Sequence, residues 1–395
     1  MSMMTSKTSI VLLCVVSVFG LSSCDRIKQA TAPDVSPEQM RKLIPTRVAE
    51  RSEWASQILD SMQQLNIRRN VVNSCSIIAV VDQESNFHAD PAVAGLGQTA
   101  MAEMNKRLED KLGKFVAGQF QDMLREKPTP QDNFASRLQR VKTEKQLDQI
   151  YREMFAFFES NYHVSLLTGV AGLFAGQPLS EYFNPVSTLG SMQVHIRYAD
   201  QHKTHATNWA DLRDHLYTRE GGLYYGIHRL MTYSAAYDQP LYRFADYNSG
   251  IYSSRNAAVQ SAINRMNKTS NRQALMLDGD LLLYGRDKDV LSDASSTELA
   301  IQALFAQYSL PISARQIRRD LKKEKTEKFE KTDTYLEIQR LYQIRFEQPP
   351  AYAIMPEVVI SGPKLSRDYN TAWFANRVNS RYQRCMQQGE RLGLY

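Results

Sequence analysis

The 395-residue sequence has few cysteines, and its histidines and cysteines form none of the common metal-binding motifs. It has no C-x-x-C pair and no H-E-x-x-H, which leaves no support for a zinc site of those spacings or for thioredoxin-like redox chemistry. We read "HKTH", His202 to His205, as a polar loop or a helix edge rather than as a pair of ligands. We therefore expect no metal and no cofactor.

Long apolar runs are also scarce. Residues 10–20 form an apolar stretch that is too short to span a bilayer comfortably and that has the build of a signal-peptide core. The stretch ends in "LSSC", Leu21 to Cys24, which resembles the bacterial lipobox. The alternative is an ordinary secretory signal with a chance cysteine.

The lipobox resemblance implies removal of residues 1–23, lipid on Cys24 and an acylated new N-terminus. Several acyl chains anchor a protein stably where one chain does not. We expect a lipoprotein of the bacterial envelope, held on the periplasmic side of the inner or outer membrane, with surface exposure left open. The polar, Pro-containing residues after Cys24 predict a tether, placed at 24–48.

The remaining cysteines are Cys75 and Cys385, since Cys14 leaves with the signal peptide. Outside the cytoplasm these two thiols could pair. The apolar context of Cys75 fits a buried free thiol equally well.

Composition is that of a globular chain, at 43% hydrophobic and 23% charged residues, and its length allows two or three domains. Removing the signal takes away one cation, Lys7, and lowers the formal net charge from +6 to +5. A mildly basic envelope protein suits an anionic polymer such as peptidoglycan, although charge alone does not identify a partner. Nothing in the sequence resembles a nucleic-acid-binding module.

Periodicity predicts a mainly α (α+β) fold. Apolar residues recur at helical spacing in residues 53–65, 104–124, 144–158, 221–237, 296–308 and 371–386, and residues 315–331 predict a charged helix. Residues 275–285 predict a short hairpin around Asp278-Gly279, and residues 351–364 predict a strand or an extended segment. Two segments stay open: 77–81 is a strand or a buried helix, and 164–176 is a buried helix or a flexible lid.

Three short motifs follow one another along the chain. Glu84-Ser85 ends the apolar run 77–81, "NPVSTLGSMQV" contains Gly190-Ser191-Met192-Gln193, and "RFADYNSG" contains Tyr247-Asn248. Together they resemble the lysozyme-like domain of bacterial lytic transglycosylases, a superfamily that includes the goose-type lysozymes. That family has E-S at the end of a buried helix, then G-L-M-Q, then A-Y-N. On this resemblance the run before Glu84 is a helix.

The sequence departs from the family pattern at three points. Ser191 stands where the family usually has Leu, Asp246 stands where it usually has Ala, and 106 residues separate Glu84 from Gly190, far more than usual. The resemblance therefore implies a lysozyme-like domain over 49–267 with a helical insertion at about 97–180. Residues 268–395 would form a C-terminal helical extension with short strands. The pattern also resembles proteobacterial lipoproteins of unassigned function.

The resemblance implies a reaction with a single acid/base, Glu84. A carboxyl group against an apolar wall keeps its proton near neutral pH, as protonation of a glycosidic oxygen requires. The same carboxylate would then take the proton of the sugar's 6-hydroxyl and close a 1,6-anhydro ring. The substrate-binding residues implied are Ser85, Gly190, Ser191, Met192, Gln193, Tyr247 and Asn248.

Two alternatives accompany this reading. Lysozymes use a second carboxylate, for which Asp82, Asp90, Glu220 and Asp246 are available without a matching motif. The chain could instead be an inactive relative that binds glycan or an envelope partner.

Overall fold

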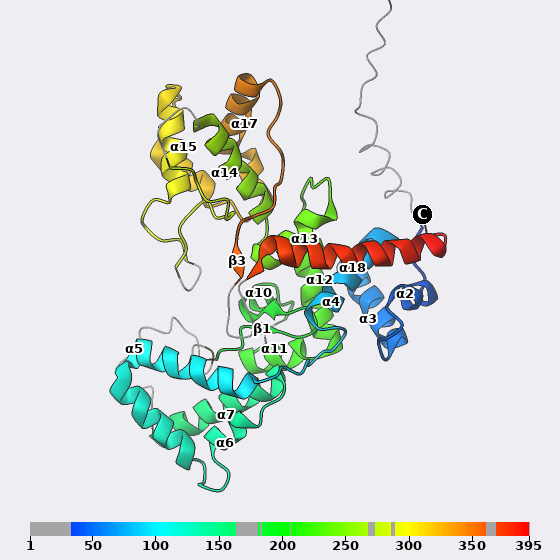
Figure 1. Ribbon diagram of the computed structural model, residues 1–395, viewed down its shortest axis with the longest axis vertical. Helices are drawn as coiled ribbons and strands as arrows, with labels where there is room; N and C mark the ends of the chain where they lie inside the picture. Colours follow the sequence, from blue (N-terminus) through cyan, green and yellow to red (C-terminus); the bar gives the residue numbers. More distant parts are fainter. Residues whose placement is uncertain are drawn as a thin grey trace, which may run out of the picture.

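The computed structural model describes residues 33–162, 181, 184–205, 207–267, 273–285, 289–360 and 369–394. The predicted signal peptide, the lipid site Cys24 and the apolar segment 164–176 lie outside the described residues. The described chain is mainly helical, which confirms the predicted fold class (Figure 1).

The helices are α2 (Pro37–Leu43), α3 (Arg51–Gln64), α4 (Val71–Glu84), α5 (Leu96–Glu126), α6 (Phe134–Gln139), α7 (Glu144–Tyr162), α10 (Ile196–Gln201), α11 (Trp209–Leu216), α12 (Arg219–Met231), α13 (Pro240–Ser249), α14 (Ser253–Asn267), α15 (Ser296–Gln307), α16 (Ala314–Leu321), the 3-10 helix η1 (Glu327–Lys331), α17 (Asp333–Phe346) and α18 (Thr371–Arg391). Two antiparallel pairs join β1 (Thr188–Leu189) to β2 (Val194–His195) and β3 (Val359–Ile360) to β4 (Tyr369–Asn370).

Helix α4 lies at the centre of the larger hydrophobic core. Asn70 caps its start by accepting a hydrogen bond from the Asn73 N–H at 2.9 Å. The run 77–81 is fully helical and buried, so the helical alternative is confirmed. The helix stops after Glu84 because Asn86 and Phe87 take left-handed backbone conformations, at φ of 50° and 62°.

Helix α18 returns from the far end of the chain and packs across α4 and α13 (Figure 1). A disulfide joins Cys75 on α4 to Cys385 on α18, which settles the alternative that the sequence left open. The final helix therefore belongs to the larger core, although the sequence placed it in a separate extension. Its predicted helical character is confirmed, over the longer range given above.

The tether predicted at 24–48 is too long. Ser36 forms a capping box with Gln39 at the start of α2. The apolar side chains of this segment are buried in the larger core: Val35, Met40, Leu43 and Ile44. The chain is thus part of the folded body from Val35 onward.

A second, smaller hydrophobic core is built from α14, α15, α16, η1 and α17 (Figure 1). The charged helix predicted for 315–331 is wrong as one helix, since α16 ends at Leu321 and η1 follows a turn. The predicted hairpin at 275–285 is also wrong. Instead, the Gln260 side chain on α14 donates to Asp278 at 2.7 Å and accepts from the Gly279 N–H at 2.9 Å, which holds the turn against the helix.

Helices α5, α6 and α7 pack on one another at one end of the molecule, within the range expected for the insertion (Figure 1). Their shared core contains clustered aromatic rings, among them Phe120, Phe134, Phe155 and Phe158. Gly113, at φ 82°, interrupts α5 with a kink. Residues 96–162 therefore form a helical unit whose apolar side chains are continuous with the larger core.

Candidate active site

Glu84 is the last residue of α4, and its side chain is partly buried. Within the described part of the chain its carboxyl group has no hydrogen-bonding partner. Burial raises the pKa of Glu84 to about 8, the positive charge of Arg229 acts in the opposite direction, and the Glu144 carboxylate raises the pKa further. The carboxyl group therefore keeps its proton at neutral pH, and no hydrogen bond within the described residues ties it to the fold.

Ser85 is buried beside Glu84, and its hydroxyl forms hydrogen bonds with backbone groups. Its hydroxyl donates to the Val81 carbonyl at 3.2 Å and accepts from the His88 N–H at 3.3 Å. This is the contact pattern of a hydroxyl at a helix C-terminus. Ser85 thus shapes the turn after Glu84, and the substrate-binding role expected from the motif stays a prediction.

The second motif forms the turn between β1 and β2. Gly190 has φ 75°, and a Cβ atom there would lie 2.1 Å from the Leu216 carbonyl oxygen, so only glycine fits. Met192 is fully buried and sits against Gly226 of α12, where a Cβ atom would lie 2.4 Å from the Met192 sulfur. Ser191 is also fully buried. These three residues form the packed base of the loop, and their expected substrate-binding role stays a prediction.

Gln193 is the member of this loop that keeps some exposure. Its Nε2 donates to Glu144 Oε2 at 3.1 Å and to the Gly190 carbonyl at 3.3 Å, while its Oε1 accepts from Thr188 at 3.0 Å. The amide therefore has one fixed orientation, set by side chains on both sides.

The third motif lies on α13 and contacts the second motif directly. The Tyr247 hydroxyl donates to the Met192 carbonyl at 2.7 Å. Burial, and after it the nearby Glu84 carboxyl, raise the pKa of Tyr247 well above its usual range. Tyr247 therefore joins all three motifs at one place, while Asn248 follows it on α13 with its side chain partly exposed.

Arg229 on α12 completes this group, although no sequence motif pointed to it. Its guanidinium donates to the Tyr247 carbonyl at 3.0 Å and lies 5.4 Å from the Tyr247 ring centroid and 5.5 Å from that of Tyr198. Arg229 thus brings a positive charge to the neighbourhood of Glu84 from a helix that carries no motif.

Three of the four carboxylates considered as alternatives form ion pairs or hydrogen bonds, and the fourth is exposed. Asp82 forms ion pairs with Arg47 and Arg381, and Asp90 accepts from the Lys145 N–H at 3.2 Å. Glu220 is exposed on the first turn of α12.

Asp246, at the position where the family usually has Ala, is fully buried. It accepts hydrogen bonds from the Ser253 hydroxyl at 3.0 Å, the Ser254 N–H at 2.7 Å and the Tyr237 hydroxyl. Asp246 therefore ties α13 to the start of α14. The carboxylate that does reach the site is Glu144, which the sequence analysis missed because it lies inside the insertion.

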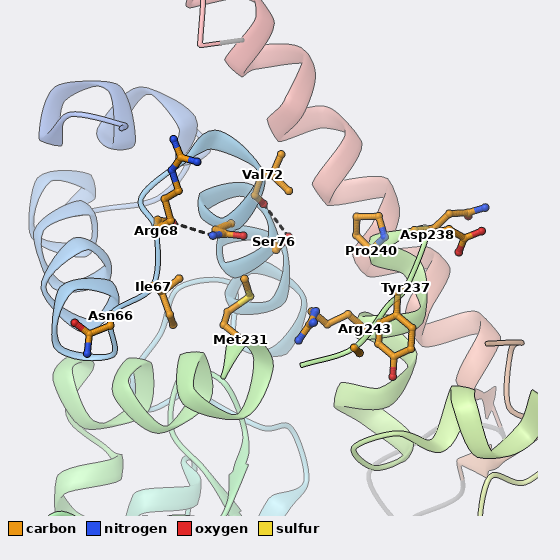
Figure 2. A pocket seen from close by; sticks show the side chains of 13 residues that line it. Asn66, Ile67, Arg68, Val72, Ser76, Met231, Tyr237, Asp238, Pro240 and Arg243 are labelled. Atoms are coloured by element: carbon orange, nitrogen blue, oxygen red, sulfur yellow. Dashed lines mark hydrogen bonds between the residues drawn. The ribbon is translucent and has the colours of Figure 1, made fainter. Parts of the chain in front are cut away.

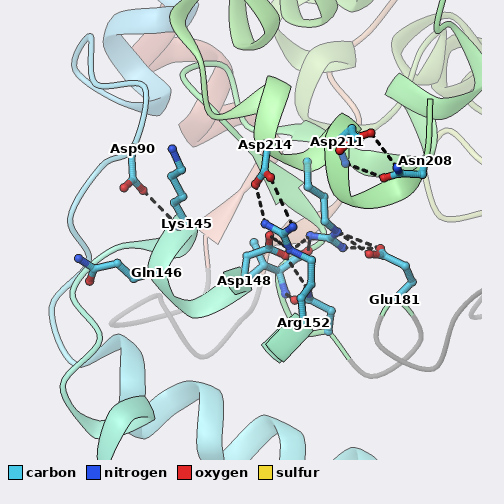
Figure 3. A network of polar contacts seen from close by, with 12 residues as sticks. Asp90, Lys145, Gln146, Asp148, Arg152, Glu181, Asn208, Asp211 and Asp214 are labelled. Carbon is cyan, nitrogen blue, oxygen red and sulfur yellow. Dashed lines mark hydrogen bonds and ion pairs between the residues drawn. The ribbon is translucent and has the colours of Figure 1, made fainter. Parts of the chain in front are cut away.

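A buried ionic network fixes the insertion to the body (Figure 3). Arg213 on α11 donates to Asp148 on α7 at 2.8 Å and to Glu181 at 2.8 Å, with the Arg213 and Asp148 side chains almost fully buried. Asn184, of the second motif's "NP", donates to the same Asp148 at 2.6 Å. Removing one member of such a network leaves a buried charge unpaired, which is strongly destabilising.

Two hollows lie near opposite ends of α4. One, of about 490 Å³, opens beside the turn after Glu84 and includes Arg47, Trp54, Asn86, Asp90 and Arg219 in its lining. The other, of about 410 Å³, lies at the start of α4, where Arg68 and Arg243 extend from different segments (Figure 2).

The described residues contain no group of three or more metal-ligating side chains. Across the same residues we find no helix with the length and apolarity needed to cross a bilayer.

Fold and site together define a mainly helical protein whose three motifs lie close to a partly buried glutamate. The chain belongs to DUF1615, a family of proteins of unknown function whose model matches residues 47–388. It is 34% identical over 398 residues to "Uncharacterized protein YaiW" of Escherichia coli (strain K12), an alignment that covers 98% of this chain and all of that protein. No solved structure matches the chain.

Proposed function

We propose that this protein is a peptidoglycan lytic transglycosylase-like lipoprotein with Glu84 as its single acid/base. The observation that supports this most directly is Glu84 itself. It is a carboxyl group without a hydrogen-bonding partner among the described residues, with a pKa of about 8, next to Tyr247 and Arg229. General acids of glycoside cleavage have this raised pKa.

In the proposed reaction, protonated Glu84 donates its proton to the oxygen that links N-acetylmuramic acid to N-acetylglucosamine. The bond from the muramic C1 to that oxygen breaks. The Glu84 carboxylate then takes the proton of the muramic 6-hydroxyl, whose oxygen bonds to C1 and closes the 1,6-anhydro ring. Arg229 stabilises the carboxylate between the two proton transfers, because opposite charges in a partly buried site attract strongly.

We further propose that Cys24 anchors the protein to a membrane of the bacterial envelope and that peptidoglycan strands are its partner there. The proposal involves no nucleic acid, metal or cofactor. Labelling with a clickable fatty acid tests the anchor: wild type should be labelled and membrane-bound, and C24S should be neither. Unchanged labelling and fractionation of C24S would contradict the anchor.

The test of the reaction uses mature protein and purified sacculi, with the products read by mass spectrometry. A 1,6-anhydro end is one water lighter than a reducing end, so the two mechanisms give different masses. E84Q keeps the side chain's size but cannot deliver the proton, and acid/base groups typically contribute about 10²–10⁴-fold. The matched control is E53Q, which changes an exposed glutamate on α3.

We expect anhydro products from wild type and E53Q, with a loss of about 10²–10⁴-fold in E84Q. Full activity in E84Q would contradict the role of Glu84. Reducing ends would indicate a lysozyme-type reaction with a second carboxylate. No products from wild type, with binding to sacculi retained, would indicate an inactive glycan-binding relative.

A further inference from the structure

A carboxylate from α7 contacts the loop of the second motif, between β1 and β2. Helix α7 starts at Glu144, whose side chain is buried at 2% exposure although most surface glutamates are solvated. Its Oε2 accepts the hydrogen bond from Gln193 Nε2 at 3.1 Å. A segment outside the family-like motifs thus reaches the one loop residue that keeps some exposure.

The chemistry of this contact fixes the orientation of the Gln193 side chain. A carboxylate only accepts hydrogen bonds, so the NH₂ end of the amide faces Glu144. The amide oxygen then faces Thr188, whose hydroxyl donates to it at 3.0 Å. Without Glu144 the NH₂ group would keep only its longer hydrogen bond, to the Gly190 carbonyl at 3.3 Å, so the orientation of the amide would be held less firmly.

The position of Glu144 is itself fixed by the start of α7. The next residue, Lys145, donates its backbone N–H to Asp90, which lies on the segment after Glu84. One helical turn further, Asp148 is locked by Arg213 and Asn184 at 2.8 and 2.6 Å. The network in Figure 3 therefore holds the first turn of α7, and with it Glu144, against the site.

Charged and titratable groups approach Glu84 from three elements. Arg229 comes from α12, Tyr247 from α13 and Glu144 from α7. The negative charge of Glu144 disfavours ionisation of Glu84, and the positive charge of Arg229 favours it. The insertion therefore acts on the same proton that the proposed reaction uses.

We propose that Glu144 is a positioning residue, supplied by α7, that orients Gln193 and acts electrostatically on Glu84. This inference rests on the proposed function for its link to catalysis. Its electrostatic part concerns only the two carboxyl groups and is measured without substrate.

The experiment compares full-length wild type with E144Q, E144D and the control E153Q, in protein labelled with ¹³C at the glutamate carboxyls. Glu153 lies on the same helix, but its half-exposed side chain pairs with Arg137. NMR titration follows the Glu84 signal, assigned from its absence in E84Q. The same proteins are assayed on sacculi across pH.

In E144Q we expect Glu84 to titrate at lower pH and the alkaline limb of activity to move the same way. Activity should fall about tenfold, because the acceptor for Gln193 becomes a neutral amide oxygen in place of a charged carboxylate, with anhydro ends retained. E144D keeps the charge, so Glu84 should titrate as in wild type. E153Q should match wild type in both measurements.

An unchanged Glu84 titration in E144Q, in a variant that melts like wild type, would overturn the proposal. So would reducing-end products in wild type that disappear in E144Q, because Glu144 would then act as a base on water. Wild type that fails to cleave sacculi would defeat the proposed function alone. In that case the Glu84 titrations of E144Q and E144D still decide whether Glu144 acts on Glu84.

Discussion

Two glutamates of the described residues have a raised pKa, partly buried Glu84 at the end of α4 and fully buried Glu324 in the smaller core, and the two differ in their partners. Glu324 lies in the smaller core with no exposure, and burial raises its pKa to about 7, against the charge of Lys325. Its carboxylate accepts hydrogen bonds from the Leu281 N–H and the Tyr284 hydroxyl. Glu84, by contrast, has no hydrogen-bonding partner among the residues that the structure describes.

This difference shows that burial alone does not identify a reactive acid. Buried polar groups in native proteins normally have hydrogen-bonding partners, and a group without one requires an explanation. Glu324 is explained by its contacts, which fasten residues 281–284 to the turn after α16. Glu84 is partly exposed, so its carboxyl group stays open to solvent, as the proposed proton transfer requires.

Replacing each of the two glutamates with glutamine tests these two roles. The largest difference between the two variants is expected in activity. E84Q should lower the cleavage rate by about 10²–10⁴-fold and leave the melting temperature nearly unchanged, because no hydrogen bond among the described residues is lost. E324Q should keep activity within about threefold while it destabilises the smaller core, since the amide NH₂ group replaces one of the two oxygens that accept these hydrogen bonds. Rates on sacculi and thermal melts check the pair, and a low melting temperature in E84Q would make Glu84 a structural residue as well.

The disulfide provides a test of whether the two cores unfold independently. Cys75 and Cys385 are 310 residues apart and clasp α4 to α18, both in the larger core. C75A/C385A should lower the free energy of unfolding by about 2–5 kcal/mol. Hydrogen exchange should quicken in α4 and α18 and change little in α15 to α17. Equal acceleration in both cores would show that they unfold as one unit.

Sequence patterns predicted the elements whose signals are local. The amphipathic spacing predicted α7, and the Ser before Glu298 predicted the start of α15. The order of the motifs predicted that Glu84 ends a buried helix. The failed hairpin at Asp278 shows the limit, because Gln260, 18 residues earlier, takes the turn's hydrogen bonds. Glu144 and Arg229 were missed for the same reason: only folding brings them near Glu84, and no motif marks either one.

The stability of the smaller core should depend on pH through Glu324. Its pKa is about 7 in the folded protein and near 4.5 in the unfolded chain, so between these values only the folded state keeps the proton. The free energy of unfolding therefore falls as pH rises through this window, by about 3 kcal/mol for this group. Urea unfolding of wild type and E324Q from pH 4 to pH 8 isolates this contribution. The contributions of the other titrating groups cancel when the free energies of unfolding of the two proteins are subtracted. A constant difference would mean that Glu324 stays ionised in the fold.

The smallest expected effect concerns Arg229, which acts on Glu84 with the sign opposite to that of Glu144. Removing the charge in R229Q should raise the pKa of Glu84 above about 8, because a cation that favours the carboxylate is lost. Activity that requires protonated Glu84 should then persist to higher pH, although the maximal rate falls because the carboxylate formed between the proton transfers is less stable. R229K keeps the charge and one donor for the Tyr247 carbonyl and should stay close to wild type. If R229Q moved the alkaline limb to lower pH, Arg229 would act on Glu84 through the packing of Tyr247 rather than through its charge.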